Sequence, residues 1–322
     1  MRLPEAGPLE PRTPGRTSGA AGPGPPGRRP GPGAWLRQQL PKLVLSPTVA
    51  ITLVFVYGFI LWTVYLSFTK SRGIPNHELV GWLNYERVWN HPRWAVALHN
   101  LAVFGTLYIS LCLLLGLTIA ILLDQRIRQE GVLRAIYLYP MALSFIVTGT
   151  AWKWMLNPGL GLEKLVKDWG FQDFTFDWIV NEKMAIYTVV IAGVWQASGF
   201  VMAMFLAGLR GVDQDLVKAA SIDGASLPKI YWRIIIPQLR PVFLSAVVIL
   251  AHLAIKSYEL VVALTGAGPG YATELPSTFM YAHTFTRSQL GWGAASATMM
   301  LLTVAAIMIP YLYSEVRTVR GR

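Results

Sequence analysis

The chain has 322 residues, of which 53% are hydrophobic and 14% are charged, and its formal net charge is +11. A soluble globular protein usually has about 25% charged residues, so this composition indicates a protein whose solvent is lipid. Basic cytoplasmic loops then account for the positive charge, and we expect no nucleic-acid partner. The single cysteine, Cys112, excludes an intrachain disulfide and a cysteine metal cluster.

Residues 1–36 form a segment that is rich in proline and glycine and is punctuated by arginine. Such a segment buries too little apolar surface to offset the loss of conformational entropy on folding, so we predict a disordered tail. It is not a signal peptide, because it has no apolar core region. Residues 37–322 are assigned to one transmembrane domain.

Six apolar runs predict membrane-spanning helices, because about 20 apolar residues cross the hydrocarbon core as a helix. The third run is short and contains Pro140, and the fifth is short unless its helix continues through Lys256 to about Leu264. The runs cover residues 43–69, 101–123, 135–152, 184–209, 241–255 and 288–314. The predicted fold class is therefore an all-α polytopic membrane protein with six transmembrane helices.

Lysine and arginine predict the orientation of these spans. With the N-terminus in the cytoplasm, 18 of the 28 basic residues fall in cytoplasmic segments, whereas the acidic residues divide almost equally. Both termini and the loop 210–240 are then cytoplasmic. The loops 69–99 and 153–183 face outside, and their many aromatic rings fit either a belt at the membrane interface or a docking surface for an external protein.

The loop 210–240 contains an unusual polar stretch, KAASIDGASLPKIYWRIIIP, at residues 218–237. Small residues surround Asp223 and Gly224, a pair that interrupts the segment and permits a turn. Pro228 suits the first turn of a new helix. The pattern predicts a helix, a bend and a second helix at the cytoplasmic membrane surface. From the residues alone, an interfacial amphipathic connector is the alternative.

This stretch resembles the EAA loop of binding-protein-dependent ABC importer permeases. That pattern has Glu-Ala-Ala, three residues, Gly, nine residues, Ile, one residue, Leu and Pro. The departure is Lys218, which reverses the charge of the family glutamate, so no ion pair of that glutamate is carried over. The spacing is kept throughout by Lys218-Ala219-Ala220, Gly224, Ile234 and Ile236-Pro237.

From about residue 40 onward the chain is similar to the carbohydrate-uptake permeases related to the maltose-type first permease. The stretches YPMALSFIVTGTAWKW, VWQASGFVMAMFLAGLRGVDQDL and YELVVALTGAGPG carry the likeness, which extends to the glucose/mannose-type permeases. The resemblance implies a type I ABC importer permease fold and a coupling helix between spans four and five. The residues placed on this coupling loop are Lys218, Ala219, Ala220, Asp223, Gly224, Ala225, Ile234 and Pro237.

The resemblance also implies the partners and the location. Expected partners are a second permease subunit, two ATPase subunits that hold ATP and Mg, a periplasmic sugar-binding protein, a sugar such as glucose or mannose, and the lipid bilayer of a bacterial inner membrane. An oligosaccharide or glycerol 3-phosphate is the alternative solute. A secondary transporter is the alternative class, although we see no convincing internal repeat of the kind common there.

The sequence shows no motif for catalysis or for a cofactor of its own. A G-x-x-x-x-G-K-[ST] phosphate loop is absent, and GAGPG at residues 266–270 lacks its lysine and its strand–helix context. We predict that GAGPG forms a turn at the outer end of the fifth span. The five histidines have no metal-ligand spacing. We therefore expect a transport subunit without metal or catalytic residues.

Polar residues in the spans are candidates for a substrate path. His252, Lys256 and Glu259 are spaced at i, i+4 and i+7, so we predict that they share one helix face, and ionisable groups at membrane depth usually face a cavity or a partner. By resemblance, the stretches after Tyr139 and Trp195 and the region 252–257 fall where the maltose-type family lines its sugar site. Packing or snorkelling is the alternative for each residue. The candidates are Ser144, Trp195, Gln196, Ser198, His252, Lys256, Tyr258 and Glu259.

Overall fold

The computed structural model describes residues 32–125 and 127–320, and it divides the chain into two units, Met1–Gly58 and Phe59–Arg322. In the first unit the described elements are α1 (Pro32–Thr52) and the π-helical η1 (Leu53–Gly58). Their apolar side chains, such as Val49 and Val54, are exposed, as expected of a helix that contacts lipid. Residues 1–31 of the predicted tail lie outside the described residues, so its disorder and its boundary at residue 36 stay predictions.

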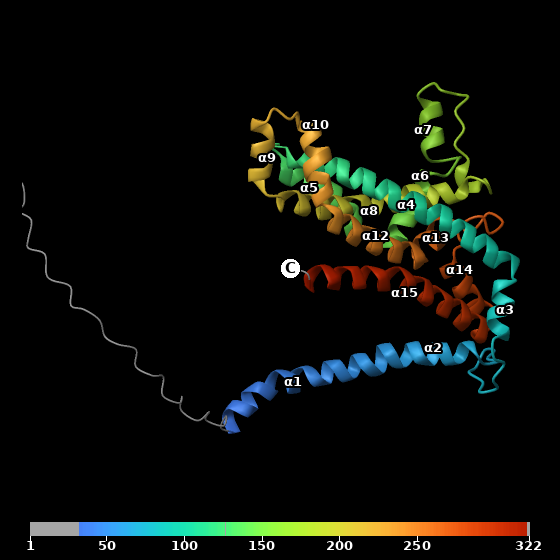
Figure 1. Ribbon diagram of the computed structural model, residues 1–322. Helices are drawn as coiled ribbons and strands as arrows, with labels where there is room; N and C mark the ends of the chain where they lie inside the picture. The colour runs from blue at the N-terminus through green and yellow to red at the C-terminus, as the bar shows by residue number, and fades with distance from the viewer. Residues whose placement is uncertain (1–31, 126, 321–322) are drawn as a thin grey trace, which may run out of the picture. The chain divides into compact units, whose positions relative to one another are not determined.

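The second unit is a bundle of helices joined by loops (Figure 1). Its elements are α2 (Phe59–Ser67), α3 (Leu83–Trp89), α4 (Pro92–Asp124), α5 (Glu130–Ala142), α6 (Phe145–Met155), α7 (Leu162–Asp168), η2 (Trp178–Val180), α8 (Ala185–Arg210), α9 (Gln214–Ile222), α10 (Leu227–Ile230), η3 (Tyr231–Ile235), α11 (Ile236–Gln238), α12 (Arg240–Ile255), α13 (Glu259–Leu264), α14 (Pro276–Tyr281), η4 (Ala282–Thr286) and α15 (Leu290–Arg320).

In the described part of the chain, four helices are long and apolar enough to cross a membrane: Val44–Ser67, Pro92–Asp124, Ala185–Arg210 and Leu290–Tyr313. Two bent helix pairs raise the number to as many as six spans if each pair is one span. α5 and α6 meet at 99°, and Leu227–Gln238 meets α12 at 64°. The six predicted spans fall on these elements, and the two short ones are the bent pairs. The all-α membrane fold is confirmed.

The bend between α5 and α6 has a local cause. Pro140 lies in the last turn of α5, where it cannot donate a backbone hydrogen bond. Ser144 then caps α6, and its hydroxyl accepts a hydrogen bond from the Val147 amide at 3.3 Å. Backbone groups freed by such a break need partners inside a bundle. Nε2 of Gln196, on α8, donates to the carbonyl oxygen of Leu143 at 2.8 Å.

A second break separates α12 from α13. The prediction that His252, Lys256 and Glu259 share one helix face is therefore wrong, because α12 ends before Lys256 and Glu259 starts α13. Ser257 lies in the break, and its carbonyl oxygen accepts a hydrogen bond from Oγ of Ser277 at 2.7 Å. The helix can end here because a neighbouring segment supplies the partner that a further turn would have given.

Helix α8 packs against α4, α5 and α12, and glycines permit the closest approaches. A Cβ atom on Gly199 of α8 would lie 1.8 Å from the carbonyl oxygen of Tyr137 on α5. A Cβ atom on Gly116 of α4 would lie 2.6 Å from Cγ1 of Val201 on α8. The positions of α4, α5 and α8 therefore depend on the absence of these side chains.

The loops of the second unit gather at two opposite ends. α9 and α10 lie at one end of α8 and α12, whereas α3, α7 and α14 lie at the other end (Figure 1). The loop 210–240 is thus separated from the loops 153–183 and 256–287, as the predicted topology requires. Which end faces the cytoplasm stays a prediction.

Candidate functional site

The polar stretch between α8 and α12 folds as a helix, a turn and a second helix, as predicted. Asp213 caps α9, and its side chain accepts a hydrogen bond from the Asp215 amide at 2.9 Å. Gly224 has φ +77°, in the left-handed region that favours glycine. Pro228 lies in the first turn of α10. The turn therefore requires the glycine that sequence analysis singled out.

The predicted coupling loop, residues 210–240, exposes apolar side chains on one side. Leu216, Ile222 and Leu227 are 49%, 85% and 63% exposed. The space beside Gly224 is open, because a Cβ atom added to this glycine would meet no other atom within 4 Å. On the opposite side, Ile230 is buried against the bundle. Exposed aliphatic side chains around an open glycine turn are typical of a protein-interaction surface.

Lys218, the departure from the family pattern, has a partner within its own helix. Its Nζ lies 2.9 Å from Oδ1 of Asp215, one turn earlier on α9, and both side chains are exposed. An exposed pair of this kind contributes about 0–1 kcal/mol. Among the other predicted coupling residues, the exposed ones are Ala219, Asp223 and Pro237, and the half-buried ones are Ala220, Ala225 and Ile234.

The helices that carry the predicted path residues pack together. α6 contacts α13 and α8, and α12 contacts α8. Trp195 of α8 is 40% exposed, and its ring meets Trp152 of α6 edge to face with 5.9 Å between centroids. The other exposed candidates are Ser144, His252, Lys256 and Glu259, and the half-buried ones are Ser198 and Tyr258.

Lys256 and Glu259 stay close despite the helix break. Together with Phe145, Leu253 and Ser257 they line a small cavity of about 10 Å³, which is about the space of one water molecule. The cavity lies where α6 begins and α12 ends. The two charged candidates are thus brought to the start of α6 by the break itself.

Gln196 differs from the other candidates because it is 4% exposed. Its Nε2 holds the Leu143 carbonyl at the α5–α6 bend, whereas its Oε1 has no hydrogen-bond partner among the described residues. The contact gives Gln196 a structural role at the bend. Its assignment to the substrate path stays a prediction.

In the part of the chain that the structure describes, no group of three or more His, Cys, Asp or Glu side chains is arranged to hold a metal ion. The segment 266–270 forms the turn that was predicted for GAGPG, with positive φ at Gly266, Ala267 and Gly270.

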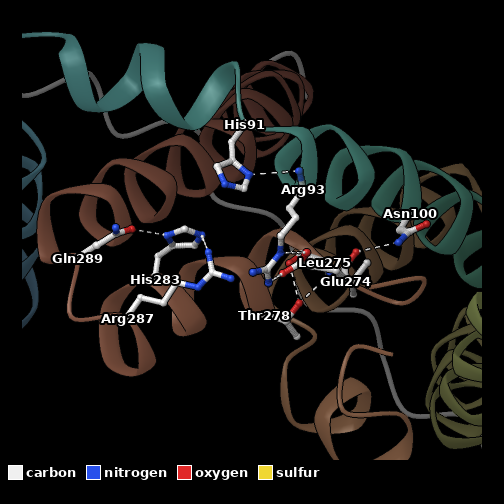
Figure 2. Close-up of polar contacts among 9 residues, drawn as sticks. All are labelled: His91, Arg93, Asn100, Glu274, Leu275, Thr278, His283, Arg287 and Gln289. Atoms are coloured by element: carbon white, nitrogen blue, oxygen red, sulfur yellow. Dashed lines mark hydrogen bonds and ion pairs between the residues drawn. The ribbon is translucent and has the colours of Figure 1, made fainter. Parts of the chain in front are cut away.

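Sequence analysis missed a polar cluster at the end of the second unit away from α9 and α10 (Figure 2). Arg93 in the first turn of α4 forms an ion pair with Glu274 through two hydrogen bonds, and the one from Nε measures 2.8 Å. The Glu274 side chain is fully buried. The Arg93 guanidinium lies 3.8 Å from the ring centroid of Tyr271. Nδ2 of Asn100 donates to the carbonyl oxygens of Ala272 and Glu274, each at 3.0 Å.

Two histidines extend this cluster. The rings of His91 and His283 are 5.5 Å apart between centroids. His283 Nδ1 lies 2.8 Å from Oε1 of Gln289, and its Nε2 faces Nη1 of Arg287 at 3.5 Å (Figure 2). Burial lowers the pKa of His283 to about 4, and the positive charge of Arg287 adds to the effect. Burial also lowers the pKa of His91. Neutral His283 thus donates from Nδ1 and accepts at Nε2.

One signal pointed to part of this cluster. Arg93 and Asn100 are seven residues apart, so they share a face at the start of an apolar helix, where polar groups usually have partners. The predicted second span began at residue 101 and left both outside. Glu274, distant in sequence, carries no local signal of its own.

The arrangement of the helices is the type I ABC importer permease fold. A bacterial ABC transporter involved in the import of the acidic polysaccharide alginate has a chain of the same fold, with a TM-score of 0.76, 16% sequence identity, and coverage of 88% of this chain and 97% of that chain. Residues 113–318 match the family described as binding-protein-dependent transport system inner membrane component. The chain belongs to this family.

Curated relatives extend the likeness over most of the chain. A Pyrococcus horikoshii protein named as a probable ABC transporter permease protein is 39% identical over 273 residues, which cover 84% of this chain and 94% of the relative. The xylose/arabinose import permease protein XacH of Haloferax volcanii is 36% identical over 264 residues, with 81% and 83% coverage. The chain is thus a membrane-spanning permease component of an ABC importer.

Proposed function

We propose that the chain forms one half of the translocation path for a sugar, most specifically glucose or mannose, in the bacterial inner membrane. A second permease subunit forms the other half. A periplasmic sugar-binding protein delivers the sugar, and two ATPase subunits hold ATP and Mg on the cytoplasmic side, where both termini of this chain lie. ATP hydrolysis takes place on those separate chains.

The observation that carries the proposal is the coupling loop. Its turn at Gly224 is open, and Ile222 and Leu227 are exposed beside it. Exposed aliphatic side chains at the tip of a short helix gain free energy when a partner covers them, about 25 cal/mol per Å² of apolar area. We assign this surface to the groove of an ATPase subunit, which then biases the outward and inward states of the permease.

The proposed sugar path lies where α6, α8, α12 and α13 meet. Trp195 offers an exposed ring for the C–H face of a sugar, while Ser144 and His252 offer exposed groups for its hydroxyls. XacH, the relative named for xylose and arabinose, supports a monosaccharide as the solute. Glucose or mannose follows from the resemblance in sequence, and an oligosaccharide or glycerol 3-phosphate is the alternative.

Uptake of labelled glucose, mannose, maltose and glycerol 3-phosphate in a strain that lacks this gene tests the proposal. We expect glucose or mannose uptake to fall and to return with the wild-type gene. A gene carrying Trp195→Ala should restore uptake to the deletion strain with a raised KM. A gene carrying Trp62→Ala, which changes a ring of similar exposure (43%) on α2, should restore uptake with the wild-type KM. Unchanged uptake of all four solutes contradicts the proposed substrates, and transport by the purified chain without an ATPase contradicts the class.

A further inference from the structure

A single phenol connects the coupling loop to the end of α4. Tyr231 is the first residue of η3, directly after α10. Its hydroxyl donates to Oδ2 of Asp124 at 3.3 Å and accepts from Nε2 of Gln125 at 3.0 Å. Asp124 is the last residue of α4, and Gln125 is its C-cap. The Tyr231 hydroxyl thus acts both as a donor and as an acceptor at the C-terminal end of α4.

The space around this contact is not filled by apolar packing. A cavity of about 180 Å³ lies between the coupling loop and the ends of α4 and α8, and Leu209, Val217 and Leu227 are among its lining residues with Tyr231. Close-packed interiors rarely leave voids much larger than a water molecule. The hydroxyl contact therefore joins two surfaces that are otherwise partly separated.

The opposite end of α4 makes a second polar contact. Arg93, in its first turn, binds the buried Glu274, and Asn100, two turns later, holds the carbonyl oxygens of Ala272 and Glu274. Residues 272–275 are the last four of the segment 265–275, which connects α13 to α14. α13 packs on α6, where a Cβ atom on Gly149 would lie 2.7 Å from Cβ of Ala263. The contact thus fixes a segment that continues into the proposed sugar path.

Between these contacts α4 is one uninterrupted helix of 33 residues, with its proline confined to the first turn. At 1.5 Å per residue such a helix is about 50 Å long. Phe104 and Cys112 of α4 are buried in the main core, and Gly116 seats it against α8. A helix packed in this way moves as a unit rather than by bending.

We propose that Tyr231 and Asn100 are positioning residues, and that α4 is the strut by which displacement of the coupling loop reaches residues 272–275. The inference rests on the proposed function, since it takes the coupling loop to contact an ATPase. The coupling loop and residues 272–275 are then two distinct sites, and each of them biases the position of α4. Coupling of this kind between two sites typically changes the affinity at one of them by about 5-fold to 150-fold.

The test uses the complete importer, purified through a tag on this chain and reconstituted in liposomes, with the co-purified sugar-binding protein as the stimulus. The readout is the ratio of stimulated to unstimulated ATP hydrolysis. Tyr231→Phe removes the hydroxyl and keeps the ring, and Asn100→Ala removes the two contacts to residues 272–275 while it leaves the ion pair. Each should lower the ratio at least 5-fold. Tyr311→Phe, which removes a hydroxyl contact between α15 and Ser245 of α12, should leave the ratio within about twofold of the wild type.

The double variant Tyr231→Phe/Asn100→Ala separates a strut from two independent defects. If α4 links the two contacts, the double variant should show no lower a ratio than the worse single variant. Wild-type ratios in both single variants, or reductions that multiply in the double variant, overturn the inference while the proposed function stands. A wild-type complex that contains no ATPase, or that the binding protein does not stimulate, overturns the proposed function instead.

Discussion

Arg93 and Glu274 are 181 positions apart in the sequence, yet they form an ion pair through two hydrogen bonds, with Glu274 fully buried and the Arg93 side chain 14% exposed. The pair joins the first turn of α4 to the segment that leads into α14. Taking two charges out of water is costly, and their attraction repays this only when the geometry and the remaining hydrogen bonds are good. Here Asn100 and Tyr271 complete the surroundings of the pair.

Glu274→Ala should destabilise the protein, because it leaves the Arg93 guanidinium, whose side chain is only 14% exposed, without its counter-ion. Breaking one partner of a buried pair typically costs about 3–5 kcal/mol. Glu78→Ala is the matched control, since the Lys70–Glu78 pair is exposed and worth at most about 1 kcal/mol. Thermal unfolding in detergent measures both. Equal midpoints for the two variants contradict the assigned importance of the buried pair.

The lowered pKa of His283 predicts that the folded protein loses stability in acid. Its pKa is about 4 in the folded protein against an ordinary 6.5. Between these values the unfolded chain binds a proton that the folded chain does not, so the free energy of unfolding falls as the pH drops from 6.5 to about 4. Above pH 6.5 His283 causes no loss in the free energy of unfolding, and below about pH 4 it causes no further loss.

Unfolding measured across this pH range should show a shallower slope for His283→Asn than for the wild type. An unchanged slope in His283→Asn would falsify the assignment of this acid sensitivity to the cluster.

Gly199→Ala should disturb the packing of α5 on α8. The new methyl would lie 1.8 Å from a backbone oxygen, so one helix must move, at a cost of about 1–3 kcal/mol or more. Gly105→Ala in α4 meets no atom within 4 Å and should be neutral or stabilising by up to about 1 kcal/mol. The two variants are compared by their purification yields and by the midpoints of their thermal unfolding. Similar values for both variants contradict the close approach.

Gly224→Leu should abolish sugar uptake while the chain still inserts into the membrane. The loss has two sources, the strain of a left-handed residue and the bulk at the proposed ATPase contact. Gly73→Leu isolates the strain, because Gly73 also has positive φ (+64°) and open space beside it, but it lies outside the coupling loop. Gly73→Leu should retain uptake. Equal loss in both variants assigns the effect to strain and contradicts a docking role for Gly224.

Much of the fold could be predicted because four of the six spans are long apolar runs. The local structure of the coupling loop could be predicted equally well, because Gly224 favours a turn and Pro228 favours a helix start through local chemistry alone. The break after α12 was missed because its cause, the Ser277 hydroxyl, lies on another element. The contact between His91 and His283 was missed for the same reason, because only tertiary packing brings these two rings together.

Co-purification of an ATPase with this chain tests the central claim most directly. Ile222→Asp places a charge at an 85% exposed aliphatic position on the coupling loop, and Leu160→Asp does the same at a 78% exposed position next to α7, at the other end of the unit. Each variant is tagged, extracted from native membranes and assayed for a bound P-loop ATPase. We predict that Ile222→Asp loses the ATPase and Leu160→Asp retains it. Retention by Ile222→Asp at the wild-type level would contradict the role of this loop as the site of ATPase docking.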